Sequence, residues 1–74
     1  MILKLKKILK DNNISNVEIE RYLNIYRGYL TDKLSLRRDF TINELKLIKV
    51  YLVNKGIIND DYDYADFLDL VEDD

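Results

Sequence analysis

The sequence contains no cysteine, no histidine, no proline and no tryptophan, and its two glycines are Gly28 and Gly56. Without cysteine no disulfide can form, and without cysteine or histidine there is no thiolate or imidazole ligand for a metal. The same absences remove the most common catalytic bases and nucleophiles. We therefore expect no metal site, no cofactor and no enzymatic activity.

A long hydrophobic run is also missing. No apolar stretch approaches the ~18 residues that a membrane-spanning helix needs. Lysines interrupt the N-terminal segment MILKLKKILKDN, which also lacks the small residues of a signal-peptide cleavage site. These features predict a soluble cytoplasmic protein, intracellular and associated with the nucleoid, with no membrane partner.

Charge is distributed unevenly along the 74 residues. All 12 Lys and Arg lie in residues 1–58 beside six acids, which gives this part a net charge of +6. Residues 59–74 hold eight acids and no base, a net charge of −8. The basic part suits a polyanionic partner, whereas the acidic end either repels such a partner or imitates one. The four lysines of residues 4–10 are interpreted as a solvated helix face.

The pattern of apolar residues predicts an all-α fold, a small five-helix bundle in one domain of residues 1–74. We expect a first helix over residues 2–10. A capping box of Ser15 and Glu18 begins a second helix, which ends before a turn at residues 24–26, and a third helix ends near Ser35.

A second capping box, made by Thr41 and Glu44, predicts a fourth helix from about Ile42. This helix stops at Gly56, which is expected in the left-handed conformation past its end. A fifth, acidic helix is expected over about residues 60–72, with the last acids frayed.

The stretch of residues 16–36, NVEIERYLNIYRGYLTDKLSL, organises the chain. Ile19 and Leu23 share one helical face, Asn24 follows them, and Leu30 and Leu34 restart the helical period. Two short helices joined by a short turn are typical of a helix-turn-helix, whose second helix enters the major groove of DNA.

These residues resemble the Cro-type phage repressors, small helix-turn-helix regulators, and the similarity continues through KLSLRRDFTINEL at residues 33–45. It covers roughly residues 3–53. Two positions depart from the family pattern. Asn24 replaces the turn glycine but tolerates the left-handed conformation. Glu20 replaces an alanine that lets the two helices approach closely, and so predicts a looser or shifted crossing.

The resemblance implies a sequence-specific DNA-binding transcriptional regulator, a homodimer that contacts double-stranded DNA in the major groove. Arg27 can bind guanine edges or phosphate bidentately, and Arg37 and Arg38 are expected to contact phosphate from the following loop. Gly28, placed inside the third helix, weakens it by roughly 1 kcal/mol relative to alanine, which a close backbone approach would explain. The expected DNA-binding residues are Tyr26, Arg27, Gly28, Tyr29, Thr31, Asp32, Ser35, Arg37 and Arg38.

The alternative is a phage-type inhibitor or antirepressor that keeps the helix-turn-helix scaffold and binds a protein, such as a repressor or nuclease. The acidic C-terminal helix would then present carboxylates that imitate DNA phosphates; the other interpretation is an acidic tail that maintains solubility. The fourth helix has more apolar surface than one core face needs, so either the chain itself or a partner covers it. The expected partner or dimer residues are Leu47, Val50, Tyr51, Tyr64, Phe67 and Leu68.

Overall fold

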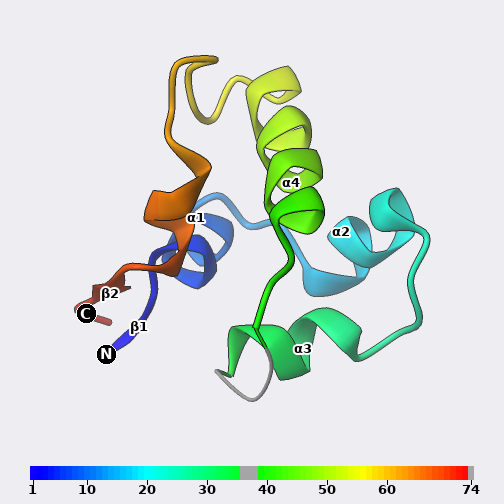
Figure 1. Cartoon of the computed structure of the whole chain (residues 1–74). Helices are drawn as coiled ribbons and strands as arrows, with labels where there is room; N and C mark the ends of the chain where they lie inside the picture. Colours follow the sequence, from blue (N-terminus) through cyan, green and yellow to red (C-terminus); the bar gives the residue numbers. More distant parts are fainter. Residues whose placement is uncertain (36–38, 74) are drawn as a thin grey trace.

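The computed structural model describes residues 1–35 and 39–73 (Figure 1). Within these ranges the chain forms four α-helices, a short 3-10 helix and a pair of two-residue strands. In order, they are β1 (Ile2–Leu3), α1 (Lys4–Asp11), α2 (Asn16–Leu23), α3 (Tyr29–Leu34), α4 (Ile42–Asn54), η1 (Tyr64–Leu68) and β2 (Leu70–Val71). In Figure 1, α4 stands in the centre, with α1 on one side, α2 on the other and α3 below. The mostly helical fold is confirmed, whereas the fifth helix is absent from the described residues.

The helices begin at residues that the sequence singles out. The Ser15 hydroxyl accepts a hydrogen bond from the backbone N–H of Glu18 at 3.2 Å, which caps α2. Thr41 and Glu44 form a complete capping box at α4, with hydrogen bonds of 3.1 Å and 2.8 Å. Each bond satisfies an N–H that has no partner inside its own helix.

Three helices end in the same way, with one left-handed residue followed by an isoleucine. The left-handed residues are Asn13, Asn24 and Gly56, with φ of 57°, 58° and 74°. The isoleucine N–H then bonds the carbonyl five residues earlier, in the pairs Ile14–Leu9, Ile25–Glu20 and Ile57–Leu52, at 2.9–3.0 Å. This is the Schellman arrangement, so the expected roles of Asn24 and Gly56 are confirmed.

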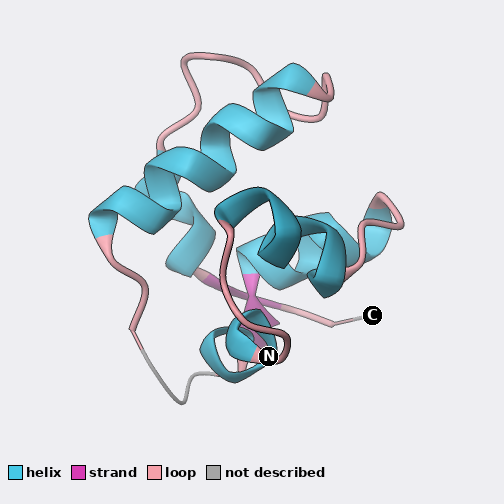
Figure 2. Cartoon of the chain, turned by 90° about the vertical axis from the view of Figure 1, so that its right-hand side faces the viewer, coloured by secondary structure: helices cyan, strands magenta, loops and turns pink. Residues whose placement is uncertain are grey.

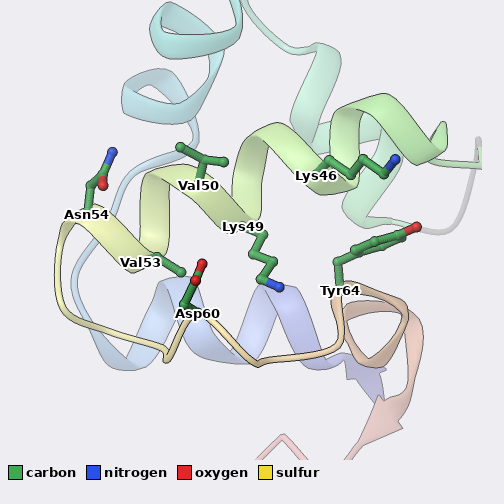
Figure 3. A pocket seen from close by; sticks show the side chains of 7 residues that line it. All are labelled: Lys46, Lys49, Val50, Val53, Asn54, Asp60 and Tyr64. Atoms are coloured by element: carbon green, nitrogen blue, oxygen red, sulfur yellow. The ribbon is translucent and has the colours of Figure 1, made fainter.

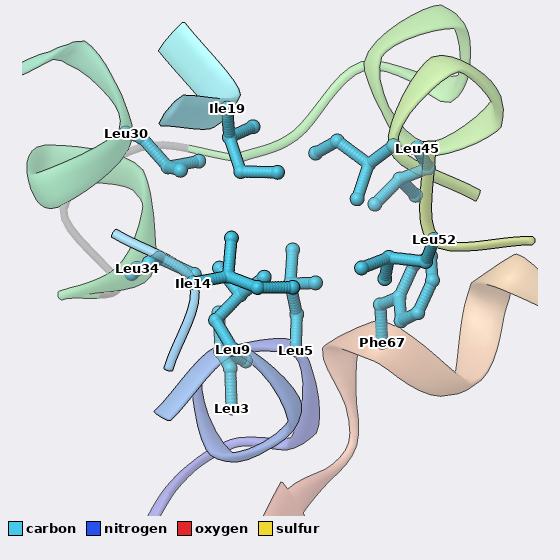
Figure 4. Close-up of a cluster of buried hydrophobic side chains, with 11 residues drawn as sticks. Leu3, Leu5, Leu9, Ile14, Ile19, Leu30, Leu34, Leu45, Leu52 and Phe67 are labelled. Carbon is cyan, nitrogen blue, oxygen red and sulfur yellow. The ribbon is translucent and has the colours of Figure 1, made fainter. Parts of the chain in front are cut away.

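The hydrophobic core draws on every helix and on both ends of the chain (Figure 4). Its buried members are Leu3, Leu5, Leu9, Ile14, Ile19, Leu30, Leu34, Leu45, Ile48, Leu52 and Phe67. Leu23 is only partly buried against this cluster, and Ile19 supplies the fully buried side chain of α2 instead. The α2–α3 pair is therefore anchored on the same core as α1 and α4.

The two chain ends pair with each other, which the sequence did not predict. β1 and β2 are antiparallel, with Ile2 opposite Val71 and Leu3 opposite Leu70 (Figure 2). The expected acidic helix over residues 60–72 is wrong, since this segment forms only the five-residue η1 before β2. Aspartate is a poor helix former because its carboxylate competes for nearby backbone groups, and Asp63 accepts the N–H of Ala65 at 3.0 Å.

No helix within the described residues is both long and apolar enough to cross a membrane.

Candidate nucleic-acid interface

The turn between α2 and α3 is longer than the sequence suggested. It spans residues 24–28, because α3 begins at Tyr29 and not directly after Tyr26. Gly28 is the N-cap of α3, with φ of 95°, and the expected position inside the helix is therefore wrong. A Cβ built on Gly28 meets no atom of the chain within 4 Å, and the left-handed backbone is itself a reason for glycine at this position.

Glu20 caps α3 from the neighbouring helix. Its side chain is buried, with 3% exposure, and one carboxylate oxygen accepts the backbone N–H groups of Gly28 at 3.0 Å and Leu30 at 2.9 Å. The expectation that Glu20 loosens the helix crossing is not supported, because its carboxylate instead joins the two helices. A negative charge at a helix N-terminus is also stabilising. Glu20 thus occupies the backbone donors of Gly28 and Leu30 at the start of α3, and the Tyr29 N–H between them bonds the Tyr26 carbonyl at 3.2 Å.

A buried ion pair joins α3 to the start of α4. The Lys33 side chain is 4% exposed. Its ammonium lies 3.1 Å from a Glu44 carboxylate oxygen and also donates to the Asp39 carbonyl. The Tyr29 hydroxyl donates to the other Glu44 oxygen at 2.6 Å. The ammonium also lies 5.1 Å from the centre of the Tyr29 ring, and within reach of the Phe40 ring.

Both members of this pair are held in their charged forms. Burial works to raise the pKa of Glu44, but the Thr41 N–H, the Tyr29 hydroxyl and the Lys33 ammonium outweigh it, so the pKa lies below its ordinary value. Burial likewise works to lower the pKa of Lys33, but Glu44 and Tyr29 outweigh it and raise that pKa. The sequence placed Tyr29 on the DNA-binding surface, yet its hydroxyl is committed to this junction.

The outward side of the turn and of α3 carries the remaining expected residues. Tyr26, Arg27, Thr31 and Ser35 are exposed, while Gly28, Tyr29 and Asp32 are partly buried. The Thr31 hydroxyl accepts from the Asn16 amide at 3.1 Å, and the Ser35 hydroxyl donates to the Thr31 carbonyl at 2.8 Å. The Tyr26 and Tyr29 rings meet edge to face at 5.2 Å. Arg37 and Arg38 lie outside the described residues.

A second polar junction, which the sequence analysis did not identify, joins α2 to the end of α4. The Glu18 carboxylate lies 2.7 Å from the Lys55 ammonium and accepts the Tyr51 hydroxyl. Lys55 and Tyr51 lower the pKa of Glu18. The rings of Tyr22 and Tyr51 pack with centres 4.8 Å apart. Tyr51 therefore has partners within the chain.

The expected protein-partner residues do not form one surface. Phe67 is completely buried in the core, and Tyr51 and Tyr64 are partly buried, whereas Leu47, Val50 and Leu68 are exposed. A groove of about 360 Å³ lies between α4 and the segment before η1. Figure 3 shows Lys49 extending from α4 toward that segment. The lining residues of the groove are Lys46, Lys49, Val50, Val53, Asn54, Asp60 and Tyr64.

Within the described residues no cluster of three or more potential metal-binding side chains occurs. No protein-family model, no curated protein and no solved structure matches this chain.

Proposed function

We propose that the chain is a DNA-binding transcriptional regulator that uses α2 and α3 as a helix-turn-helix. The observation that carries the proposal is the way α3 is fixed. Glu20 caps its start, Glu44 binds Lys33 on its inner side, and Leu30 and Leu34 lie in the core. A recognition helix must be held rigidly against its scaffold while its outer face stays accessible.

Arg27 is the residue that we assign to DNA contact first. It is exposed in the turn before α3, and no hydrogen bond or ion pair joins it to another described residue. The Thr31 and Ser35 hydroxyls already have partners within the chain. A free guanidinium can bind two acceptors of guanine or of a phosphate group. Because Glu20 occupies the start of α3, this contact must come from side chains and not from the helix N-terminus.

The position of the acidic segment supports the same proposal. Residues 60–73 carry the excess negative charge, and their ordered elements η1 and β2 pack against α1, α4 and β1. In Figure 1 this segment lies across α4 from α2. Exposed charges act over only about 10 Å at moderate salt. The acids therefore repel DNA less at the outer face of α3 than they would if they lay beside it.

A salt-dependent titration with duplex DNA tests the proposal. A regulator should bind random duplex at low salt, with affinity that falls steeply as salt rises, and should bind sequences selected from a random pool more tightly. Arg27→Ala should reduce affinity for a selected sequence by ~1–3 kcal/mol. The matched control is Lys46→Ala, which removes one positive charge from the groove beside α4 and should affect selected and random DNA equally. Absence of salt-dependent binding would overturn the proposal.

One observation favours a second function, the binding of a protein through α4. Leu47 and Val50 of α4 expose large apolar side chains, and Val50 also lines the groove of Figure 3. Such a surface suits a second copy of the chain or a target protein, as in the antirepressor interpretation. Val50→Gln, which removes the apolar side chain without adding a charge, should then change the mass measured by sedimentation, or abolish capture of a target, without altering DNA affinity. The expected regular array of carboxylates on a helix gains no support, because that helix does not form.

A further inference from the structure

The acidic C-terminal strand lies on the basic N-terminal helix. β2 pairs with β1 directly before α1, and the Lys4 N–H donates to the Asp69 carbonyl at 2.7 Å. Farther along, the Asp73 carboxylate lies 2.8 Å from the Lys10 ammonium near the other end of α1. Residues 69–73 therefore run along α1 and do not fray into solvent. Of the last acids, which were expected to fray, Asp73 is therefore held on α1 by Lys10.

The α1 surface beside this strand is strongly basic. Lys6 and Lys10 are exposed and, four residues apart, lie on one helical face. Lys7 is next to Lys6 in the sequence and forms an ion pair with Asp11, with 3.4 Å between nitrogen and oxygen. The charges of Lys10, Lys7 and Lys6 all act on the Asp73 carboxylate and lower its pKa. Among described residues, the large exposed hydrophobic side chains all lie outside α1.

We propose that residues 69–73 compete, from within the chain, for a second polyanion-binding surface, formed by Lys6, Lys7 and Lys10, to which the phosphates of duplex nucleic acid bind. The surface presents several positive charges and no base-reading geometry, so the binding is independent of sequence. It lacks the exposed apolar side chains that a helix needs to lie in a membrane interface, which favours phosphates in water over a lipid surface. The proposal does not require α2 and α3 to bind DNA.

Residues 69–73 are held weakly enough for duplex nucleic acid to displace them from α1. β1 and β2 are two residues long, Leu70 is 50% exposed, and the Lys10–Asp73 pair is open to solvent. Exposed ion pairs contribute little and are screened by salt, and isolated two-residue pairings add few hydrogen bonds. A duplex offers a phosphate every few ångströms and can engage several lysines at once, whereas the strand presents a single bonded carboxylate to them.

The test compares two variants with the same change in net charge. Glu72→Gln with Asp73→Asn removes carboxylates from the strand on α1, while Asp60→Asn with Asp61→Asn removes two exposed carboxylates from the loop after α4. We expect the first variant to bind random duplex DNA at least about threefold more tightly than the second at low salt. Its affinity should also fall more steeply with salt.

Two further variants test whether Lys6 and Lys10 form the binding surface. Adding Lys6→Gln and Lys10→Gln to the first variant should abolish the gain, whereas adding Arg27→Ala should leave the gain intact. The last comparison separates this surface from the one proposed at α2 and α3. Circular dichroism melting of each variant verifies that it is folded.

Three outcomes would overturn the proposal. An equal gain in the two charge-matched variants would mean that only net charge matters. A gain that survives loss of both lysines would place the binding elsewhere. Vesicles with anionic headgroups that bind the first variant more tightly than DNA does would assign the surface to membranes instead.

Discussion

A carboxylate oxygen of Glu20 on α2 lies 2.9 Å from the backbone nitrogen of Leu30 on α3 and accepts its N–H. This hydrogen bond joins a side chain of α2 to the N-terminal end of α3. The same oxygen accepts the Gly28 N–H, so one buried side chain sets both the turn and the start of the helix. At most helix starts a nearby Asp, Ser or Thr side chain accepts the first backbone N–H groups. Here Glu20 does so, although it precedes Gly28 by eight residues and Leu30 by ten.

Glu20→Ala should therefore destabilise the protein, even though alanine is the residue that the resembled family carries there. The change leaves the buried N–H of Leu30 and the partly buried N–H of Gly28 without an acceptor, at a cost of about 2–3 kcal/mol. Urea unfolding measures this loss. Glu20→Gln is the matched control, because its amide oxygen can still accept and its loss should be smaller. If alanine were tolerated as well as glutamine, the cap would contribute nothing to stability.

Asn24 and Gly56 allow a second comparison, between two helix ends of the same geometry. Asn24→Gly should change stability little or increase it, because glycine enters the left-handed region freely. Gly56→Ala should cost about 1 kcal/mol, since an L side chain is strained there although no neighbouring atom obstructs it. Thermal unfolding of both variants gives the two values. A loss at Asn24→Gly as large as that at Gly56→Ala would show that the asparagine side chain matters in its own right.

The sequence predicts features that depend on neighbouring residues, and it misses those that depend on distant ones. Caps at Ser15 and Thr41 and the left-handed Asn24 follow from short patterns, and the structure has them. The pairing of residues 2–3 with 70–71 joins the two ends of the chain, and no local pattern specifies it. In the same way, Glu20 looks like a misfit until the position of α3 is known.

In the candidate nucleic-acid interface, too, the sequence predicts what depends on neighbouring residues and misses what depends on distant ones. Thr31 could be placed on an outward surface from helical spacing alone, whereas Arg27 is exposed because it lies in the turn before α3. Lys33 could not be recognised as buried, because lysine is almost never buried unless it is paired, and its partner Glu44 is eleven residues away on another helix. The apolar spacing around Phe67 suggested a helix with an apolar stripe, but the aspartates between those residues favour a short 3-10 turn.

The Phe67 side chain is completely buried in the core and so anchors the acidic C-terminal segment there. Phe67→Ala removes a fully buried ring that lies against Tyr62 and should cost about 3–5 kcal/mol, a large share of the stability of a small domain. Leu68→Ala, at the next position and 41% exposed, is the control and should cost far less. Deletion after Ile58 should unfold the chain for the same reason. A cooperative melt unchanged by Phe67→Ala would contradict this account of the core.

The junction of Lys33 and Glu44 predicts how stability depends on pH. The folded-state pKa of Glu44 lies below its ordinary value of 4.5, so its contribution is complete above that pH and is lost as the pH falls through the folded value. The folded-state pKa of Lys33 lies above 10.5, so its contribution is complete below that pH and is lost only at higher pH. Stability from this pair should therefore be constant across the neutral range and decline on both sides.

Glu44→Gln tests the acid side. At neutral pH it should destabilise the protein by about 1–3 kcal/mol, because the nearly buried Lys33 ammonium loses its charged partner. The difference in unfolding free energy between the native protein and the variant should shrink as the pH falls below 4.5, since the unfolded chain then takes up a proton at Glu44 before the native protein does. It should disappear once the pH is below the lowered pKa of the folded state, where the native carboxylate is protonated too. Glu18→Gln, which breaks the more exposed pair with Lys55, is the control and should cost less at neutral pH. A difference between native and Glu44→Gln protein that stays the same from neutral pH down to about pH 3 would mean that the carboxylate charge does not stabilise the junction.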